Sequence, residues 1–222
     1  MIIVINKQAE QIRKDFIKEY KHPSIKESFY DPVLTVKQVY FFQKLLLESD
    51  YKQKNDLFKA LIHMQISLDI HDLVDLEFDS IEENRNQTNQ LQVLVGDFHS
   101  SYFYRLLSEH NLLDELYHFI QSIKSINEIK MSLLHQDEIK IKDFNKLLNQ
   151  VETVHCGLYY SLLDFCQMNK YKNDVEFELI KELVYHIDSY WLSLLKSREP
   201  AIEQAIDAKI NYLNEIIITN RR

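Results

Sequence analysis

Glycine and proline are nearly absent from this sequence, which holds 2 glycines and 3 prolines in 222 residues. An average chain of this length would carry roughly 16 glycines. Hairpins, phosphate-binding loops and many helix ends depend on glycine, because only glycine takes a positive φ at little steric cost. The scarcity argues against a β-sandwich, a β-barrel, a P-loop and a glycine-rich dinucleotide fold, and it favours a protein built from helices.

An excess of positive charge and a cysteine framework are also missing. The net charge is −8, from 26 basic and 34 acidic residues, and no basic cluster is longer than Arg221–Arg222. Because phosphate binding needs a concentrated positive surface, we expect no nucleic-acid partner. Cys156 and Cys166 lie ten residues apart in one predicted helix, which predicts reduced, packed thiols rather than a disulfide or a metal site.

Long apolar runs are absent as well. The apolar stretches are broken by charge well short of the roughly 20 residues that a membrane span requires. The start, residues 1–5, is apolar but short, and it is followed at once by Asn6 and Lys7, unlike an export signal. We therefore expect a cytoplasmic location.

Apolar residues recur at helical spacing through most of the chain. The spacing predicts helices over about 12–20, 36–47, 57–76, 89–108, 112–134, 142–168 and 175–195 and from about 200 onward, with a loop over 77–89. Thr35 is the expected N-cap of the second of these helices. No linker-like composition and no repeat interrupts the pattern. The sequence therefore predicts an all-α protein, a single-domain bundle of about eight helices over residues 1–222.

Two Glu-x-x-His pairs suggest one kind of chemistry, Glu115/His118 and Glu152/His155. Di-iron bundles use this spacing because side chains at i and i+3 project from one helix face toward a shared metal pair. They also need a glutamate from each of two further helices, and Glu178 or Glu182 is a candidate for one of these. With 9 histidines in the chain, such spacings also arise by chance. A di-iron-type metalloprotein and a generic helical adaptor are kept as alternative functions.

An acidic run near the end of the third predicted helix suggests a second kind of chemistry, the binding of a metal ion. Asp72, Asp75 and Asp79 fall at i, i+3 and i+7 and share one helix face. Clustered carboxylates of this kind bind Mg²⁺. A solvated helix end leading into a loop is the alternative interpretation.

The segments around this run carry a resemblance to a known family. The fourth predicted helix opens with V-L-V-G-D-F at 93–98, and the third ends with His71-Asp72. Together they resemble the all-trans prenyl diphosphate synthases, whose H-D-D-x-x-D helix binds Mg²⁺ and an allylic diphosphate before a V-L-x-G-D-[FY] helix. Here Leu73 and Leu76 replace two of the aspartates, and E-E-N-R at 82–85 stands in place of the family's arginine pair.

These departures imply a chain without its own activity. Ionising an allylic diphosphate requires Mg²⁺ ions and basic side chains to spread the charge of the leaving group. His71, Asp72 and Asp75 form only a degenerate metal motif, and the sixth and seventh predicted helices hold no adjacent aspartates. We expect no metal, no cofactor and no catalytic residue in this chain.

One branch of the family fits such a degenerate chain. Over about residues 10–135, including K-H-P-S-I at 21–25 and D-P-V-L at 31–34, the sequence is similar to the small subunits, component one, of two-component heptaprenyl or hexaprenyl diphosphate synthases. The resemblance implies a heterodimer for menaquinone biosynthesis. A large subunit with Mg²⁺ adds isopentenyl diphosphate to farnesyl diphosphate, and the small subunit is required for activity and helps set product length.

The resemblance also implies a contact surface. In homodimeric relatives the helices after the first metal motif pack across the dimer and approach the product tunnel, which makes the fourth predicted helix the expected contact. Aromatic side chains suit both an interface and a tunnel wall, although they could equally fill this chain's own core. A homodimer of the isolated chain and a peripheral membrane contact through the lipid product are left open. The candidate contact residues are Gly96, Asp97, Phe98, His99, Tyr102, Phe103 and Leu106.

Overall fold

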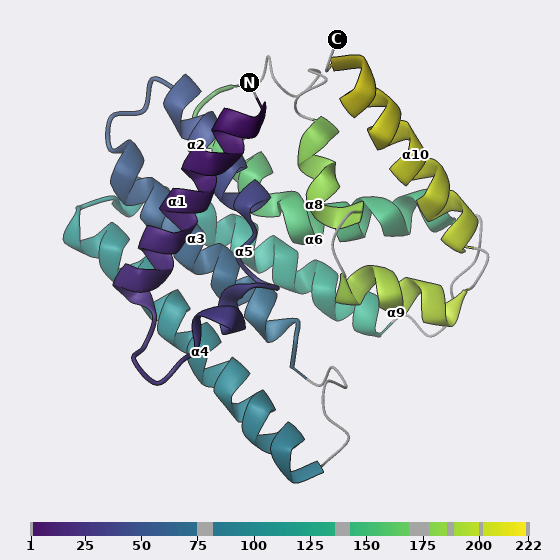
Figure 1. Ribbon diagram of the computed structural model, residues 1–222, viewed down its shortest axis with the longest axis horizontal. Helices are drawn as coiled ribbons and strands as arrows, with labels where there is room; N and C mark the ends of the chain where they lie inside the picture. The colour runs from purple at the N-terminus through teal and green to yellow at the C-terminus, as the bar shows by residue number, and fades with distance from the viewer. Residues whose placement is uncertain are drawn as a thin grey trace. The chain divides into compact units, whose positions relative to one another are not determined.

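The computed structural model describes residues 2–74, 82–135, 143–168, 178–185, 189–199 and 202–220 (Figure 1). Within these ranges the regular structure is helical and no strand occurs, so the all-α prediction is confirmed for the described part of the chain. The helices are α1 (Ile2–Tyr20), the 3-10 helix η1 (Glu27–Tyr30), α2 (Val36–Glu48), α3 (Lys54–His71), α4 (Glu82–Glu109), α5 (Leu113–Leu134), α6 (Phe144–Phe165), the 3-10 helix η4 (Leu179–Lys181), α8 (Glu182–Tyr185), α9 (Tyr190–Arg198) and α10 (Ile202–Asn220).

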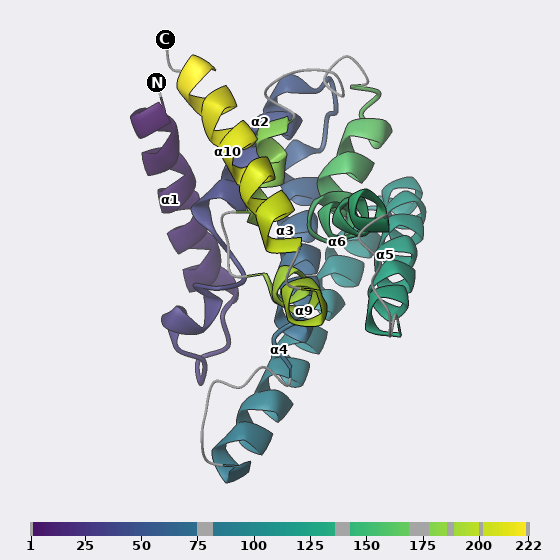
Figure 2. The ribbon, with the colours of Figure 1, turned by 90° about the vertical axis from the view of Figure 1, so that its right-hand side faces the viewer.

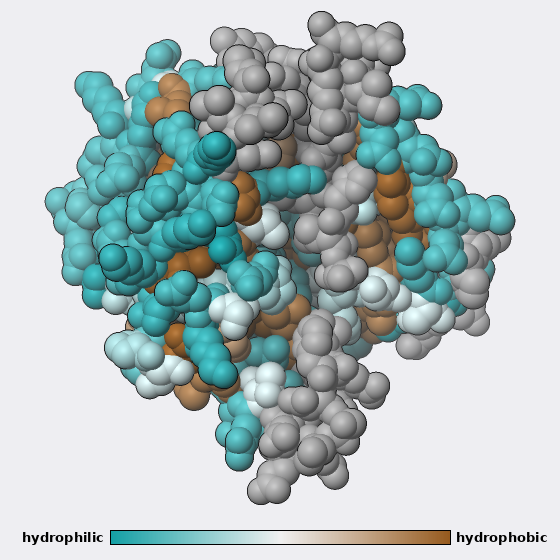
Figure 3. Space-filling view, viewed as in Figure 1, coloured by the Kyte–Doolittle hydropathy of each residue, from teal (hydrophilic) through white to brown (hydrophobic). Residues whose placement is uncertain are grey.

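The contacts divide the chain into two compact units, Met1–Leu116 and Tyr117–Arg222, which we call unit 1 and unit 2. The single domain over residues 1–222 stays a prediction. On the face drawn in Figure 3, hydrophilic residues cover most of the outer surface of the helices, and hydrophobic residues show between them. In the described ranges, no helix has both the length and the apolar character that crossing a membrane needs.

Helix α3 forms the centre of unit 1, where it packs against α4 and α2, while α1 packs on α2. Its buried positions run almost without interruption from Leu57 to Ile70. They include the polar side chains of His63 and Gln65 as well as leucines and isoleucines. A helix covered on nearly all sides needs partners for such polar groups, and this need shapes the site described below.

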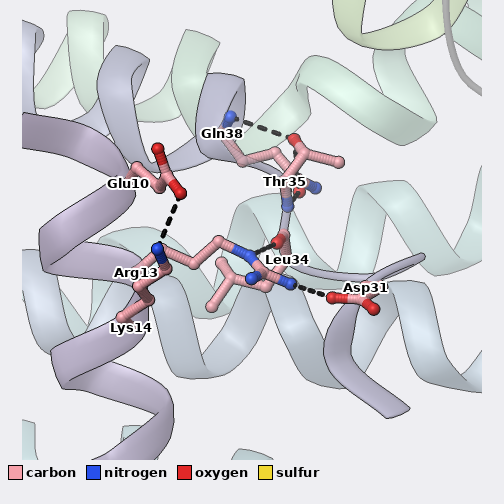
Figure 4. A network of polar contacts seen from close by, with 7 residues as sticks. All are labelled: Glu10, Arg13, Lys14, Asp31, Leu34, Thr35 and Gln38. Atoms are coloured by element: carbon pink, nitrogen blue, oxygen red, sulfur yellow. Dashed lines mark hydrogen bonds and ion pairs between the residues drawn. The ribbon is translucent and has the colours of Figure 1, made fainter. Parts of the chain in front are cut away.

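A polar network holds the segment that joins α1 to α2 (Figure 4). Arg13 on α1 donates from Nε to the carbonyl oxygen of Leu34, and its Nη2 lies 2.7 Å from Oδ1 of Asp31. The predicted N-cap is confirmed: the Thr35 hydroxyl accepts from the backbone N–H of Gln38 at 3.2 Å, and Gln38 Oε1 accepts from the backbone N–H of Thr35 at 2.7 Å. This capping box fixes where α2 begins.

Helix α6 supplies the core of unit 2. A Cβ built on Gly157 would lie 2.8 Å from Cγ1 and Cδ1 of Ile126, so this glycine lets α5 and α6 approach closely. At the other end of α5, the guanidinium of Arg198 donates to the carbonyls of Leu133 and Leu134 at 2.7 and 3.1 Å. These bonds satisfy carbonyl groups that a helix end leaves without intrahelical partners.

Four predicted element boundaries are wrong. The first predicted helix, 12–20, already begins at Ile2. The third, 57–76, ends at His71 and is followed by a turn, so Asp72 does not lie on a continuing helix face as predicted.

The loop predicted over 77–89 is helical from Glu82, where α4 begins, while residues 75–81 lie outside the described residues. The seventh predicted helix, 175–195, is not continuous in the described residues. Ser189 caps a separate helix, α9, because its hydroxyl accepts a hydrogen bond from the backbone N–H of Leu192 at 3.3 Å. As an N-cap residue, Ser189 has extended rather than helical backbone angles, so the predicted helix is interrupted there.

Candidate functional site

The last residue of α3, His71, lies against Gly96 in α4. A Cβ on Gly96 would be 2.7 Å from Cε1 and Nε2 of the imidazole, so a larger residue would displace the ring. Nε2 of His71 lies 3.6 Å from Oδ1 of Asp97, and the two side chains are 38% and 67% exposed. A glycine inside a helix costs about 1 kcal/mol relative to alanine. The imidazole of His71 occupies the space that a Cβ at this position would take.

The acidic run around His71 does not assemble into a chelating cluster in the described residues. Asp69 accepts hydrogen bonds from the amides of Gln38 at 2.7 Å and Gln65 at 3.0 Å, one on each carboxylate oxygen. Asp72 follows at the end of α3, and Asp75 lies outside the described residues. Where the structure is described, no group of three or more His, Cys, Asp or Glu side chains could hold a metal ion. Asp69 therefore contributes to packing between α2 and α3.

The predicted contact residues on α4 are divided between the interior and the surface of unit 1. His99, Phe103 and Leu106 are buried, with 0%, 0% and 7% of their surface exposed, and they fill the core of this unit. Gly96 is buried too. The remaining three keep solvent-accessible surface: Asp97 is exposed, and Phe98 and Tyr102 are half-buried. Contact with another subunit through these residues stays a prediction.

Sequence analysis missed a buried pair of histidines between α3 and α4. Nδ1 of His63 lies 2.8 Å from Nδ1 of His99, and Nε2 of His99 lies 3.1 Å from the hydroxyl of Tyr30 on η1. Both imidazoles are 0% exposed. The ring of Tyr102 stacks on that of His63, with centroids 4.8 Å apart and an interplanar angle of 8°. The pair thus joins α3, α4 and η1 at one point.

Burial keeps this histidine pair neutral. It lowers the pKa of His63 to about 2, with the neighbouring charges of His99, Arg105 and Lys59 acting in the same direction, and it lowers the pKa of His99 to about 4. It also raises the pKa of Tyr30 to about 12. With both imidazoles neutral, one Nδ1 donates the shared hydrogen and the other accepts it. The sequence signal that could have found the pair is a histidine inside the apolar run L-I-H-M at 61–64.

Aromatic and cationic side chains surround the half-buried rings of α4. The guanidinium of Arg105 lies 4.4 Å from the centroid of the Tyr102 ring, and the edge of Tyr102 meets Tyr20 of α1 with centroids 5.4 Å apart. The rings of His22 and Phe98 meet edge to face at 6.4 Å. Tyrosine and arginine are enriched where proteins bind other proteins, and the composition of this surface suits such a role.

The two Glu-x-x-His pairs have other partners. Glu115 accepts from the hydroxyl of Tyr51 at 2.6 Å, and Glu152 accepts from the hydroxyl of Tyr185 at 2.7 Å. His118 Nε2 donates to the carbonyl of Ser161 at 3.0 Å, and His155 Nε2 lies 2.6 Å from the hydroxyl of Ser189. These contacts give all four side chains structural roles, and the arrangement does not support the di-iron alternative.

The remaining candidates of the sequence lie in unit 2. Nζ of Lys181 lies 3.0 Å from Glu178 and 3.6 Å from Glu152, so Glu178 too is engaged in an ion pair. The thiol of Cys156 is buried and lies 3.6 Å from the carbonyl oxygen of Ile180. No disulfide joins it to Cys166, as predicted.

Comparison with known proteins gives the family. A family model described as heptaprenyl diphosphate synthase (HEPPP synthase) subunit 1 matches residues 22–209, most of the chain. The chain therefore belongs to this family, as the sequence resemblance implied. It is also 31% identical over 105 residues to heptaprenyl diphosphate synthase component 1 of Geobacillus stearothermophilus, a match that covers 47% of this chain and 44% of that protein. The match thus spans less than half of the relative's length. No solved structure matches.

Proposed function

We propose that this chain is the non-catalytic, regulatory subunit of a heterodimeric long-chain trans-prenyl diphosphate synthase. Its partner is a catalytic large subunit that holds Mg²⁺ and adds isopentenyl units to farnesyl diphosphate, making heptaprenyl diphosphate for the menaquinone side chain. The family membership supports this proposal. The name of the Geobacillus relative supports it further, because a component 1 implies at least one other component.

The observation that carries the non-catalytic part of the proposal is the position of His71. This histidine heads the degenerate metal motif, and it packs on Gly96 and faces Asp97. The carboxylate one helical turn before Asp72, that of Asp69, is engaged by two amides. Ionisation of an allylic diphosphate needs several carboxylates to hold Mg²⁺ against the leaving group. These residues therefore suit a chain that supports the chemistry of a partner.

A reconstitution assay tests the proposal. The purified chain, the catalytic large subunit from the same organism, and their equimolar mixture are each given farnesyl diphosphate, radiolabelled isopentenyl diphosphate and Mg²⁺. We expect prenyl transfer only in the mixture, together with a heterodimer in size-exclusion chromatography with light scattering. Turnover by this chain alone would sink the proposal, and so would full activity of the large subunit by itself.

The same assay tests the influence on product length. Aromatic side chains can wall an apolar tunnel, and Phe98 keeps accessible surface on α4. We expect Phe98→Ala to shift the product distribution seen by reversed-phase thin-layer chromatography, while the complex still forms. In the proposal the complex is cytoplasmic and touches the membrane only through its lipid product. A product distribution identical to that of the unaltered chain would contradict the role in chain length.

A further inference from the structure

The last helix of unit 2 reaches α6 mainly through a short segment. In the described part of this unit, α10 has its main contacts with η4, α8 and α9, and η4 and α8 in turn pack on α6. Helices η4 and α8 span only Leu179–Lys181 and Glu182–Tyr185. We call η4, α8 and α10 together the flap. A long helix that is attached through so short a segment can separate from the rest of its unit when that segment does.

The contact between the flap and α6 has a polar centre at Glu152, which is 5% exposed. Its carboxylate accepts a hydrogen bond from the hydroxyl of Tyr185 in α8 at 2.7 Å. The carboxylate also lies 3.6 Å from Nζ of Lys181 in η4 and 3.9 Å from Nζ of Lys209 in α10. Each element of the flap thus reaches the same side chain. Because charged groups regain their hydration when such a contact opens, a polar contact separates more readily than an apolar one.

The flap covers the thiol of Cys156. Sγ of this residue lies 3.6 Å from the carbonyl oxygen of Ile180 in η4, and the residue is 0% exposed. Cys156 follows Glu152 by four residues, so both side chains lie on one face of α6. A reagent reaches a buried thiol only when the structure over it opens. The reactivity of Cys156 therefore reports whether the flap stays closed.

Helix α9, which lies between α8 and α10 in the sequence, is held separately on α5 and α6. The guanidinium of Arg198 donates to two carbonyls at the end of α5, and Nζ of Lys130 lies 5.9 Å from the centroid of the Trp191 ring. The hydroxyl of Ser189, which caps α9, lies 2.6 Å from Nε2 of His155 on α6. Figures 1 and 2 both show α10 starting beside α9. Helix α9 is thus a fixed point between the two parts of the flap.

We propose that the flap opens from α6 as one unit while α5, α6 and α9 stay folded, and that Glu152 is the group that fastens it. The open form exposes the thiol of Cys156, which the closed form protects. This property of unit 2 is independent of the proposed function.

Alkylation of Cys156 in the folded protein tests the proposal. Cys166, at the end of α6, is first replaced in every variant by Cys166→Ala, which leaves one of the two cysteines. Iodoacetamide is added at urea concentrations below the unfolding transition, and mass spectrometry follows the modified fraction. The dependence of the labelling rate on urea measures the surface that opening exposes. We expect a dependence of at most about half of that for global unfolding, because the flap is a small part of the chain.

Three variants separate opening of the flap from unfolding of unit 2. Glu152→Gln removes both ion pairs and is expected to speed labelling about thirtyfold. The matched control is Glu203→Gln, which removes a surface pair between α10 and α9, 3.5 Å from Nζ of Lys196, and should change the rate by less than about twofold. Ile126→Val weakens the packing of α5 on α6, so it should lower the urea midpoint and leave labelling within about twofold.

Two results overturn the proposal. If labelling in the Cys166→Ala chain has the full urea dependence of global unfolding, Cys156 is reached only when the whole structure opens. If Ile126→Val speeds labelling as much as Glu152→Gln does, the flap has no opening of its own.

A milder variant keeps the role of Glu152 testable if Glu152→Gln does not fold, which circular dichroism checks. Lys209→Gln removes one ion pair and leaves Tyr185 and Lys181 in place, so labelling should be about fivefold faster. An unchanged labelling rate in the folded variants at Glu152 and Lys209 would show that this carboxylate does not fasten the flap.

Discussion

Acid should destabilise unit 1 through the pair formed by His63 and His99. Both pKa values are lowered by burial, so the unfolded chain binds more protons than the folded chain once the pH falls below the ordinary value of 6.5. Protonating both rings would also point two N–H groups at each other across the 2.8 Å between the Nδ1 atoms. In the described residues, Nε2 of His63 has no hydrogen-bond partner. An N–H formed there by protonation would therefore find no acceptor. The stabilisation from the neutral pair is therefore complete above pH 6.5 and is lost as the pH falls.

The size of this loss of stability is set by how far the two histidines are protonated in the unfolded chain. As long as the folded pKa values stay below the working pH, each histidine costs about 1.4 kcal/mol of unfolding free energy for each pH unit below 6.5. Between pH 7.5 and pH 5 this amounts to about 2 kcal/mol for each histidine and about 4 kcal/mol for the pair. The result depends little on the folded values of about 2 and about 4, because both lie below pH 5.

Urea denaturation followed by circular dichroism, at pH values from 7.5 to 5, measures this loss. Other groups titrate in the same range, so the unaltered chain is compared with His63→Phe, which keeps a ring against Tyr102 and removes one titrating site. His63→Phe is expected to be less stable at pH 7.5, because His99 loses its partner. The informative quantity is the slope of stability against pH, which should fall by about 1.4 kcal/mol per pH unit. Equal slopes in the two proteins would refute the reasoning.

Local signals in the sequence predict much of this structure. Thr35 and Gln38 identify the start of α2, because a capping box involves only residues three positions apart. The glycine inside α4 indicates a close approach, since a mid-helix glycine needs a packing reason. That reason proved to be the imidazole of His71. Features that depend on a few neighbouring residues can thus be predicted from one chain.

Features that depend on distant residues could not be predicted. The contact between His63 and His99 needs α3 and α4 to pack in one particular register, which no local pattern specifies. The start of α4 at Glu82 was missed for another reason. Apolar periodicity reveals a helix only where one face is buried, and the stretch 82–89 is polar.

Two further predictions concern unit 2 and the two glycines. Glu152 is 5% exposed, accepts a hydrogen bond from a tyrosine hydroxyl and forms ion pairs with two lysines. Glu152→Gln keeps the hydroxyl contact and removes the ion pairs, so it should lower the unfolding free energy by about 2 kcal/mol in urea denaturation. An unchanged midpoint would show that the ion pairs contribute nothing. The glycines form a matched pair, because in each case a Cβ would meet a side chain at less than 3 Å. At Gly157 the obstacle is Ile126, which is 1% exposed and has no room to move, so Gly157→Ala should destabilise by about 2 kcal/mol. At Gly96 the obstacle is the end of the half-exposed His71 side chain, which can rotate into solvent while alanine improves helix propensity. Gly96→Ala should therefore leave the unfolding free energy within about 1 kcal/mol of the unaltered chain. Equal destabilisation by the two substitutions would contradict the difference inferred between the His71 contact and the Ile126 contact.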